Sequence, residues 1–169
     1  MEVYVLVPVR RTFAGIFLGV LMLVLAVLSL LGSCVTIFTL PFVFVFGGLW
    51  YLIMFQLNKE FEYSYFDGEL RFARVTNKSR RKALGSCTMD DVIQIAPVGD
   101  RSVSKYENDN GIKVKDFTSH VKGRPYYDLI LQQSGNLTLI KFEPDDKFLD
   151  SMEKKYKQKI IRRVKAQEE

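Results

Sequence analysis

Residues 12–58 read TFAGIFLGVLMLVLAVLSLLGSCVTIFTLPFVFVFGGLWYLIMFQLN, and these 47 consecutive positions contain no Asp, Glu, Lys, Arg or His. The other 122 residues of the 169-residue chain hold all 43 of its acidic residues, lysines and arginines. A single helix of this length would extend about 70 Å, more than twice the roughly 30 Å of hydrocarbon in a bilayer. The stretch therefore predicts a hairpin that crosses a membrane twice.

The two predicted crossings are residues 12–31 and 35–57, separated by a tight turn at residues 32–34. Backbone amides surrounded by hydrocarbon must find partners inside their own segment, so both crossings should be helical despite their many β-branched residues. Pro41 should kink the second helix near its start, because proline lacks the amide hydrogen that a helix uses.

The charges beside the hairpin predict its orientation. Arg10 and Arg11 precede the first crossing and Lys59 follows the second, while the turn carries no charge. The positive-inside rule then places both termini in the cytoplasm, in a multi-pass protein of the cell membrane. In this topology Cys34 lies outside and Cys87 inside, so the two cannot form a disulfide, and Cys87 is expected to be a small buried residue.

A signal peptide is the alternative interpretation of the first apolar run. Two arginines, an apolar segment and the sequence LGSC at residues 31–34 resemble a secretion signal with a lipoprotein cleavage box. The apolar region of such signals usually has 7 to 15 residues, whereas this run has about 20, so a membrane helix is favoured. Whether residues 31–34 are processed stays open, but the second helix returns the chain to the cytoplasm in either case.

Two glycines in the first crossing predict close helix packing. Gly15 and Gly19 form a Gly-x-x-x-Gly pair, which lets a second helix approach closely. Packing within the hairpin is the favoured use, and a homo-oligomer is the alternative. The hairpin contains no ionisable residue, which argues against a proton relay or an ion path built from these helices alone.

The remainder of the chain predicts antiparallel strands. Residues 60–66 (EFEYSYF) alternate between aromatic and polar side chains, as a half-buried strand does. Asp67 and Gly68 then suit a two-residue hairpin turn, and residues 69–75 return antiparallel. Further strands are expected at residues 82–88, 91–97, 126–132 and 136–143, with one or two more around residues 102–106 and 111–116.

A C-terminal helix should complete the domain. Pro144 suits its first position, and apolar residues follow at spacings of three or four: Phe148, Leu149, Met152, Tyr156, Ile160 and Val164. One face of this helix should pack on the sheet. The predicted fold class is α+β, with a transmembrane hairpin in residues 1–58 and, in residues 59–169, a small antiparallel β-barrel or sandwich capped by the helix.

Several motifs together resemble a known family. The order of two helices followed by EFEYSYFDGEL, NKSRRK, DDVIQIAP, VKDFTSH and KFEPDDKFL resembles an uncharacterised family of two-helix membrane proteins from Gram-positive bacteria. The resemblance covers nearly the whole chain. The C-terminal part is similar to bacterial pleckstrin-homology-like (PH-like) domains, which implies two near-orthogonal sheets capped by a helix. The resemblance supplies no catalytic residues.

A basic segment follows the first strand of the domain. Six cations with no acid among them lie within twelve residues: Arg71, Arg74, Lys78, Arg80, Arg81 and Lys82. The second strand runs back toward the membrane, so the loop at residues 76–82 should lie beside the inner headgroups. Since each cation near anionic lipid contributes about 1 kcal/mol, we expect headgroup contacts from Arg74, Lys78, Arg80, Arg81 and Lys82, without headgroup specificity. A solvated turn that satisfies the positive-inside bias is the alternative.

Residues suited to catalysis are few. His120 is the only histidine and the two cysteines are predicted on opposite sides of the membrane, so we expect no metal site and no cofactor. The DFTSH segment at residues 116–120 could hold a nucleophile and its base, but such adjacent polar residues are far more typical of turns. We therefore predict that the protein is not an enzyme.

The charge balance of the soluble part disfavours nucleic acid as a partner. Residues 59–169 hold 22 cations and 18 anions, and no recognised nucleic-acid motif interleaves aromatic residues with the lysines. The basic C-terminal residues are interpreted as a solvated helix face, which leaves the lipid bilayer and another protein as the expected partners.

These features predict a membrane-anchored binding or scaffolding module at the inner membrane surface. Its expected partners are the bilayer and another membrane or membrane-proximal protein. The long polar interval at residues 99–125 is the preferred contact segment, with a mobile insertion as the alternative. The competing function is that of an accessory subunit of a transporter or envelope enzyme, in which the hairpin itself is the functional part.

Overall fold

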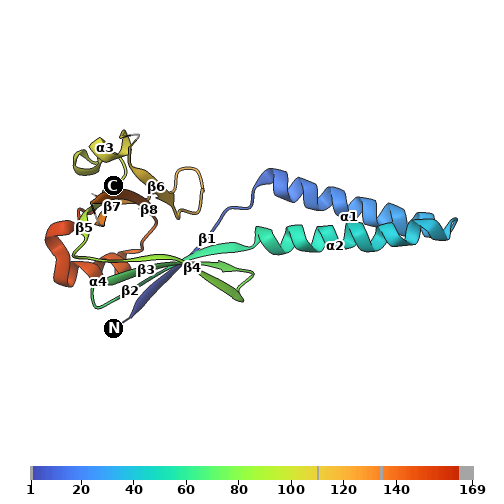
Figure 1. Cartoon of the computed structure of the whole chain (residues 1–169), viewed down its shortest axis with the longest axis horizontal. Coiled ribbons are helices and arrows are strands. Elements are labelled where there is room, and N and C mark those ends of the chain that lie inside the picture. Colours follow the sequence, from blue (N-terminus) through green and yellow to red (C-terminus); the bar gives the residue numbers. More distant parts are fainter. Residues whose placement is uncertain (1, 110, 134, 164–169) are drawn as a thin grey trace, which may run out of the picture. The chain divides into compact units, whose positions relative to one another are not determined.

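The computed structural model describes residues 2–109, 111–133 and 135–163, and it separates into two compact units. The hairpin unit consists of Arg10–Lys59 and Val75–Arg80, and the sheet unit of Met1–Val9, Glu60–Arg74 and Arg81–Glu169. Figure 1 labels the elements of both units.

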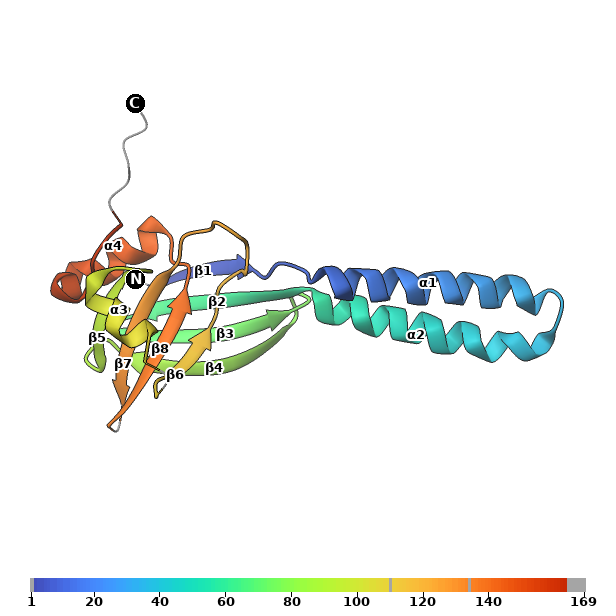
Figure 2. The same cartoon turned by 90° about the horizontal axis from the view of Figure 1, so that it is seen from above.

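Two helices packed side by side form most of the hairpin unit (Figures 1 and 2). Helix α1 covers Phe13–Ser33 and α2 covers Leu40–Leu57, with a 3-10 turn η1 at Ile37–Thr39 between them. The two predicted helices are therefore confirmed, with α1 ending two residues later and α2 beginning five residues later than expected. Pro41 lies in the first turn of α2, directly after η1, where its missing amide hydrogen leaves no helical bond unmade.

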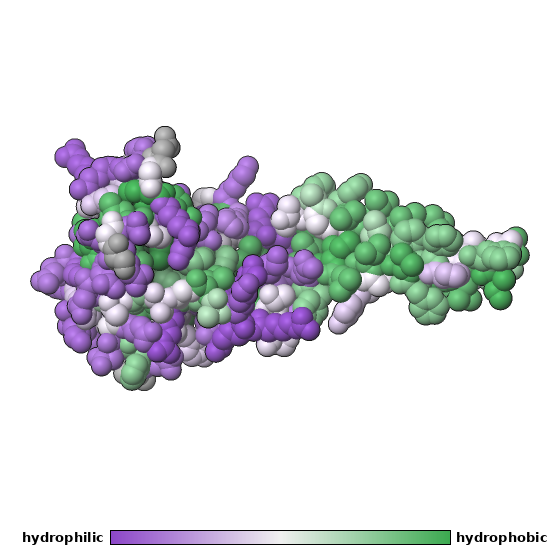
Figure 3. All heavy atoms as spheres, in the orientation of Figure 1, coloured by the Kyte–Doolittle hydropathy of each residue, from purple (hydrophilic) through white to green (hydrophobic). Residues whose placement is uncertain are grey.

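Most apolar side chains of both helices are exposed. No residue of α2 is buried, and large side chains such as Phe13, Phe17 and Phe44 are 82%, 62% and 73% exposed. Figure 3 shows a continuous apolar surface over these helices. Soluble proteins rarely expose an apolar patch larger than a few hundred Å². Both helices are long and apolar enough to cross a membrane, and their exposure distinguishes them from the core helices of a soluble protein.

The first sheet has the order β1-β2-β3-β4. Its strands are β1 at Val3–Pro8, β2 at Lys59–Phe66, β3 at Glu69–Thr76 and β4 at Arg80–Thr88. Strand β1 was not predicted, and it pairs antiparallel with β2 so that Val7 lies opposite Phe61. Residues 3–8 therefore belong to the sheet unit, which corrects the expected division at residue 58. No local turn announces this strand, since its partner follows about 50 residues later.

The second sheet has the order β5-β7-β8-β6. Its strands are β5 at Val92–Pro97, β6 at Lys113–Asp116, β7 at Tyr127–Gln133 and β8 at Asn136–Phe142. Strand β6 lies parallel to β8, whereas the other pairs are antiparallel. The expected all-antiparallel arrangement is thus wrong at this edge, because the chain passes through a helix before it joins the sheet.

That helix replaces a predicted strand. Helix α3 covers Arg101–Glu107, where the sequence suggested a strand at residues 102–106. The Asp100 side chain caps it by accepting a hydrogen bond of 2.8 Å from the Ser102 backbone N–H. This cap starts a helix at Arg101, whereas the pattern of residues 102–106 had suggested a strand.

The two sheets form a sandwich and not a closed barrel, which corrects the more specific of the two expectations. Inward side chains from both sheets share one apolar cluster that includes Tyr63, Leu70 and Phe142, all fully buried. Figure 2 shows the second sheet with its edge strand β6. The buried Cys87, 4% exposed, also belongs to this cluster, as predicted.

Helix α4 covers Asp146–Tyr156 and packs its apolar face into the same core. Asp145 caps the helix by accepting a 2.8 Å hydrogen bond from the Phe148 N–H, and Phe148, Leu149 and Met152 are buried as predicted. The helix is shorter than expected. Ile160 lies beyond it in an extended segment that forms a bridge with Ile95 of β5, and Val164 lies outside the described residues.

Candidate functional site

The charged end of the hairpin unit brings together three segments of the chain. Arg10 and Arg11 lie just before α1, and Asn58 and Lys59 lie just after α2. The Arg11 guanidinium donates a hydrogen bond of 2.6 Å to the side-chain carbonyl of Asn58. This bond joins the two ends of the hairpin at the point where the apolar run stops.

The third segment is the turn between β3 and β4. The Asn77 N–H donates to the backbone carbonyl of Asn58 over 2.7 Å, and the Arg80 guanidinium lies 5.6 Å from the centroid of the Phe55 ring. Asn77 and Lys78 adopt φ angles of 49° and 57°, as a tight hairpin turn with two left-handed residues requires. The turn is therefore held against the end of α2 by backbone and side-chain contacts.

Five cations gather at this end of the hairpin unit, whose residues include no Asp or Glu. We call them the basic belt: Arg10, Arg11, Lys59, Lys78 and Arg80. Each lies within a few residues of a helix end or on the turn that contacts it. The belt therefore borders the apolar helices with positive charge on one end, while the turn at the opposite end is uncharged.

The predicted headgroup-contact residues divide between the two units. Lys78 and Arg80 belong to the basic belt, whereas Arg74, Arg81 and Lys82 belong to the sheet unit. Arg81 forms a 2.8 Å ion pair with Glu62 on β2, and its side chain stays 67% exposed. The Nε atom of Arg74 is buried and has no hydrogen-bond partner among the described residues. Sequence reasoning used Arg10, Arg11 and Lys59 for orientation and did not group them with the turn.

The two glycines of α1 face α2 within the hairpin. A Cβ atom added to Gly15 would come within 2.6 Å of a methyl group of Leu57, and one added to Gly19 would come within 2.5 Å of the Met54 methyl group. Gly47 and Gly48 of α2, in contrast, have open space where a Cβ would lie. The Gly15 and Gly19 pair thus occupies the contact between the two helices.

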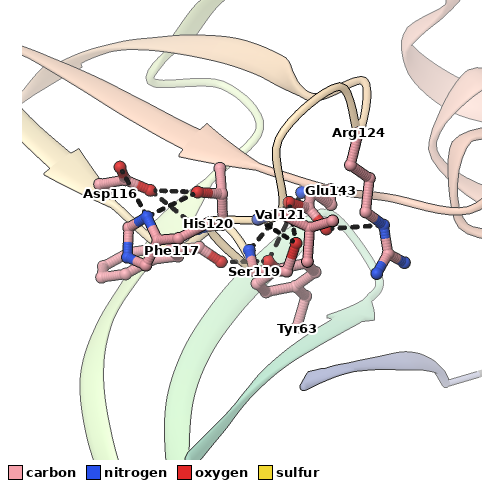
Figure 4. Close-up of polar contacts among 9 residues, drawn as sticks. Tyr63, Asp116, Phe117, Ser119, His120, Val121, Arg124 and Glu143 are labelled. Carbon is pink, nitrogen blue, oxygen red and sulfur yellow. Dashed lines mark hydrogen bonds and ion pairs between the residues drawn. The ribbon is translucent and has the colours of Figure 1, made fainter. Parts of the chain in front are cut away.

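A second polar cluster lies in the sheet unit around a buried carboxylate (Figure 4). Oε1 of Glu143 accepts 2.8 Å hydrogen bonds from both the backbone N–H and the hydroxyl of Ser119. The Arg124 Nε lies 3.0 Å from Oε2 of the same carboxylate. We call Glu143, Ser119 and Arg124 the Glu143 network. It ties the loop after β6 to the end of β8.

Tyr63 of β2 extends this network to the first sheet. Its hydroxyl donates to the backbone carbonyl of Phe117 and accepts a 3.4 Å hydrogen bond from the Glu143 N–H. Burial raises the pKa of Tyr63 well above the usual tyrosine value, so the hydroxyl keeps its proton and remains a donor. The loop between β6 and β7 is thereby joined to both sheets.

The DFTSH segment runs from the last residue of β6 into this loop, where the Asp116 side chain accepts a hydrogen bond from the Thr118 N–H. Ser119 is fully buried, and its hydroxyl donates a hydrogen bond to Glu143, away from the histidine (Figure 4). The Thr118 hydroxyl lies 3.4 Å from Nδ1 of His120 but donates to Asp116 over the shorter distance of 2.7 Å. His120 and Asp116 border an open pocket of about 390 Å³. The segment thus has the contacts expected of a turn, as the sequence favoured.

The sequence did not lead us to predict Glu143 and Arg124 as residues of this polar network. The available signal was an acidic residue placed directly after the apolar strand LTLIKF, where a buried carboxylate needs a partner. The identity of that partner, 19 residues earlier in the chain, could not be read from the sequence.

Comparison with known proteins supports the PH-like fold. A family model described as bacterial PH-like domain (DUF6106) matches residues 1–162. The match includes β1, both apolar helices and every strand of the two sheets. Searches of the curated proteins and of the solved structures found no match. The chain therefore belongs to the bacterial PH-like domain family DUF6106.

Proposed function

We propose that this protein is a membrane-anchored, non-enzymatic binding module. In this proposal α1 and α2 cross the cell membrane, both termini lie in the cytoplasm, and the PH-like domain engages another membrane or membrane-proximal protein at the inner surface. The basic belt contacts anionic headgroups without selecting one lipid.

The observation that carries the proposal is the charge pattern of the hairpin unit. Its apolar helices expose their side chains, five cations lie at one end, and the turn at the other end has none. Helix α1 has 21 residues and so extends about 31 Å, which matches the roughly 30 Å of bilayer hydrocarbon. Cations at one end of such a hairpin favour the cytoplasmic side.

The contacts of the β3–β4 turn support the proposed binding of anionic headgroups by Lys78 and Arg80. The turn is bonded to Asn58 at the end of α2, so Lys78 and Arg80 stay close to the residues where the apolar run ends. Cations near an anionic membrane surface contribute about 1 kcal/mol each, an amount that salt screening reduces. The belt is thus expected to add to the anchoring that the helices provide.

Cysteine accessibility tests the topology. Cys34 is exposed in the hairpin turn and Ser79 is exposed in the β3–β4 turn, whereas Cys87 is buried. In intact cells a membrane-impermeant maleimide should label Cys34 of the natural chain. The double variant Cys34→Ser/Ser79→Cys should be labelled only when the membrane has been permeabilised. The single variant Cys34→Ser is the background control. Labelling of the double variant in intact cells would overturn the proposed orientation.

A separate experiment tests the lipid contact. The full chain is placed in nanodiscs of phosphatidylcholine with or without phosphatidylglycerol, and hydrogen exchange of the amides at residues 76–80 is measured. Exchange should slow when the anionic lipid is present, and the Lys78→Gln/Arg80→Gln variant should lose that difference. Lys113→Gln/Lys115→Gln on β6 is the matched control. Equal exchange in both lipids for the natural chain would refute headgroup contact.

A further inference from the structure

Helix α3 covers the outer face of the second sheet. Five apolar side chains form a cluster between them: Ala96, Val103, Ile112, Ile130 and Leu139. Val103 is the buried residue of α3, and the helix packs on β5 and β7. This cluster is separate from the core of the sandwich, so α3 is held in place by a small contact of its own.

A carboxyl group is buried beneath this helix. Asp128 lies on β7 opposite Ala96 of β5 and Lys141 of β8, and it is fully buried. Neither of its carboxylate oxygens accepts a hydrogen bond from an N–H or O–H group of the described residues. The neighbouring side chain from α3 is another carboxyl group, that of Glu107. Two carboxyl groups can form a hydrogen bond if one of them carries a proton.

The charges around Asp128 favour that proton. Glu107 of α3 and Asp116 of β6 repel a second negative charge, Lys141 of β8 opposes them, and β5 carries no titratable side chain. The Lys141 Nζ lies over the Tyr126 ring, 5.6 Å from its centroid, and forms no ion pair with Asp128 within the described residues. Burial, followed by the hydrogen bond and charge of Glu107, raises the pKa of Asp128 to about 7, while the bond with Asp128 lowers the pKa of Glu107.

We propose that Asp128 and Glu107 form a proton-dependent latch that holds α3 on the second sheet. With one shared proton, the Asp128 hydroxyl donates to the Glu107 carboxylate and joins β7 to α3. When the proton is lost, two carboxylates face each other beneath the helix with no donor between them. Opening of α3 then hydrates both charges and uncovers the apolar side chains of β5, β7 and β8. This inference does not depend on the proposed membrane function.

The direction of the pH effect follows from linkage. A carboxyl group whose pKa is raised in the closed state favours closure at low pH, and that contribution is lost as pH rises through the closed-state value. An exposed aspartate has a pKa near 4. The opening of α3 should therefore increase by about tenfold per pH unit between pH 5 and pH 7, and it should level off above pH 7.

Hydrogen exchange of the full chain tests the latch. The amides of residues 103–107 are followed at pH 5, 6, 7 and 8, and each rate is divided by the intrinsic exchange rate at that pH. The natural chain should lose about tenfold in protection per unit from pH 5 to 7. Asp128→Asn keeps the shape of the side chain and supplies a permanent donor to Glu107, so its protection should not depend on pH.

Two further variants make the result decisive. Glu107→Gln offers its own donor to Asp128 and removes the neighbouring negative charge, so the pH dependence of α3 should weaken and move to lower pH in this variant, which gives an independent test if Asp128→Asn fails to fold. Asp109→Asn removes an exposed carboxylate near the end of α3 and retains an acceptor for the Gly111 N–H, so it should behave as the natural chain does. The proposal is overturned if the natural chain shows constant protection from pH 5 to 7, or if Glu107→Gln shows the same pH dependence as the natural chain.

Discussion

Replacing Glu143 by glutamine should open the loop between β6 and β7. The substituted amide retains one oxygen that can accept hydrogen bonds from Ser119, but it presents an NH2 group to the Arg124 Nε, which lies 3.0 Å from Oε2 in the natural chain. A neutral NH2 group would then lie beside the guanidinium in place of a carboxylate oxygen, at a position that is 4% exposed. The loop relieves this conflict by moving away from the end of β8.

The magnitude follows from the bonds that change. Hydrogen bonds to a charged group contribute about 1.5–3 kcal/mol each and those between neutral groups about 1 kcal/mol, so weakening the two Ser119 bonds costs about 1–4 kcal/mol. The Arg124 side chain is 44% exposed, so solvent screening limits the loss of its ion pair to less than about 1 kcal/mol. The expected total is about 1–5 kcal/mol, so loop opening should increase by at least about fivefold and, at the middle of this range, by about 150-fold.

Native-state hydrogen exchange of the full chain measures this effect. The Ser119 N–H donates to Glu143 and the Val121 N–H donates to the Ser119 hydroxyl, so both amides report on the network. Their exchange should accelerate by the stated factor in Glu143→Gln, while the amides of α4 keep their rates. Lys122→Gln removes an exposed charge from the same loop and is the control. If Glu143→Gln leaves the Ser119 exchange unchanged, the carboxylate does not hold the loop.

Three further predictions concern the core, the hairpin and the thiols. Phe148→Ala empties a fully buried position under α4 and should lower the free energy of unfolding by about 3–5 kcal/mol, measured by denaturant titration in detergent. Gly19→Leu should separate α1 from α2 and lower the melting temperature of the hairpin, whereas Gly47→Leu, which meets open space, should leave it unchanged. Burial raises the pKa of Cys87 to about 12, so at pH 8 a maleimide should modify the exposed Cys34 and leave Cys87 unmodified until the chain unfolds; equal rates for both thiols would contradict the structure.

Local patterns in the sequence correctly predicted several elements. The 47-residue apolar run gives the two helices of the hairpin, because only a helix can satisfy the backbone of such a segment without polar partners. Asp67 and Gly68 give the β2–β3 turn, where both residues adopt positive φ. The spacing of Phe148, Leu149 and Met152 likewise gives the buried face of α4. In each case the determining interactions lie within a few residues along the chain.

The candidate sites depended on contacts between distant residues. The sequence could suggest that the β3–β4 turn returns toward the hairpin, but the bond between Asn77 and Asn58 and the grouping of the turn with Arg10 and Arg11 come from the structure. Residues 3–8 became a strand because β2 offered an open edge. The valines of residues 3–8 favour a strand, but no local signal identifies its partner, and none identifies the bond between Asn77 and Asn58.

The sequence by itself determined which segments are apolar, which turns are tight and which helix face is buried, because these properties follow from side-chain hydrophobicity and backbone preferences over short distances. The tertiary structure alone decided the strand order, the parallel pairing of β6 with β8, and the partners of Glu143 and Asp128. Because burying a carboxyl group without a partner costs free energy, a buried Asp or Glu predicts that a partner is present. The partner itself is selected by the folding of the whole domain, which brings distant parts of the chain together.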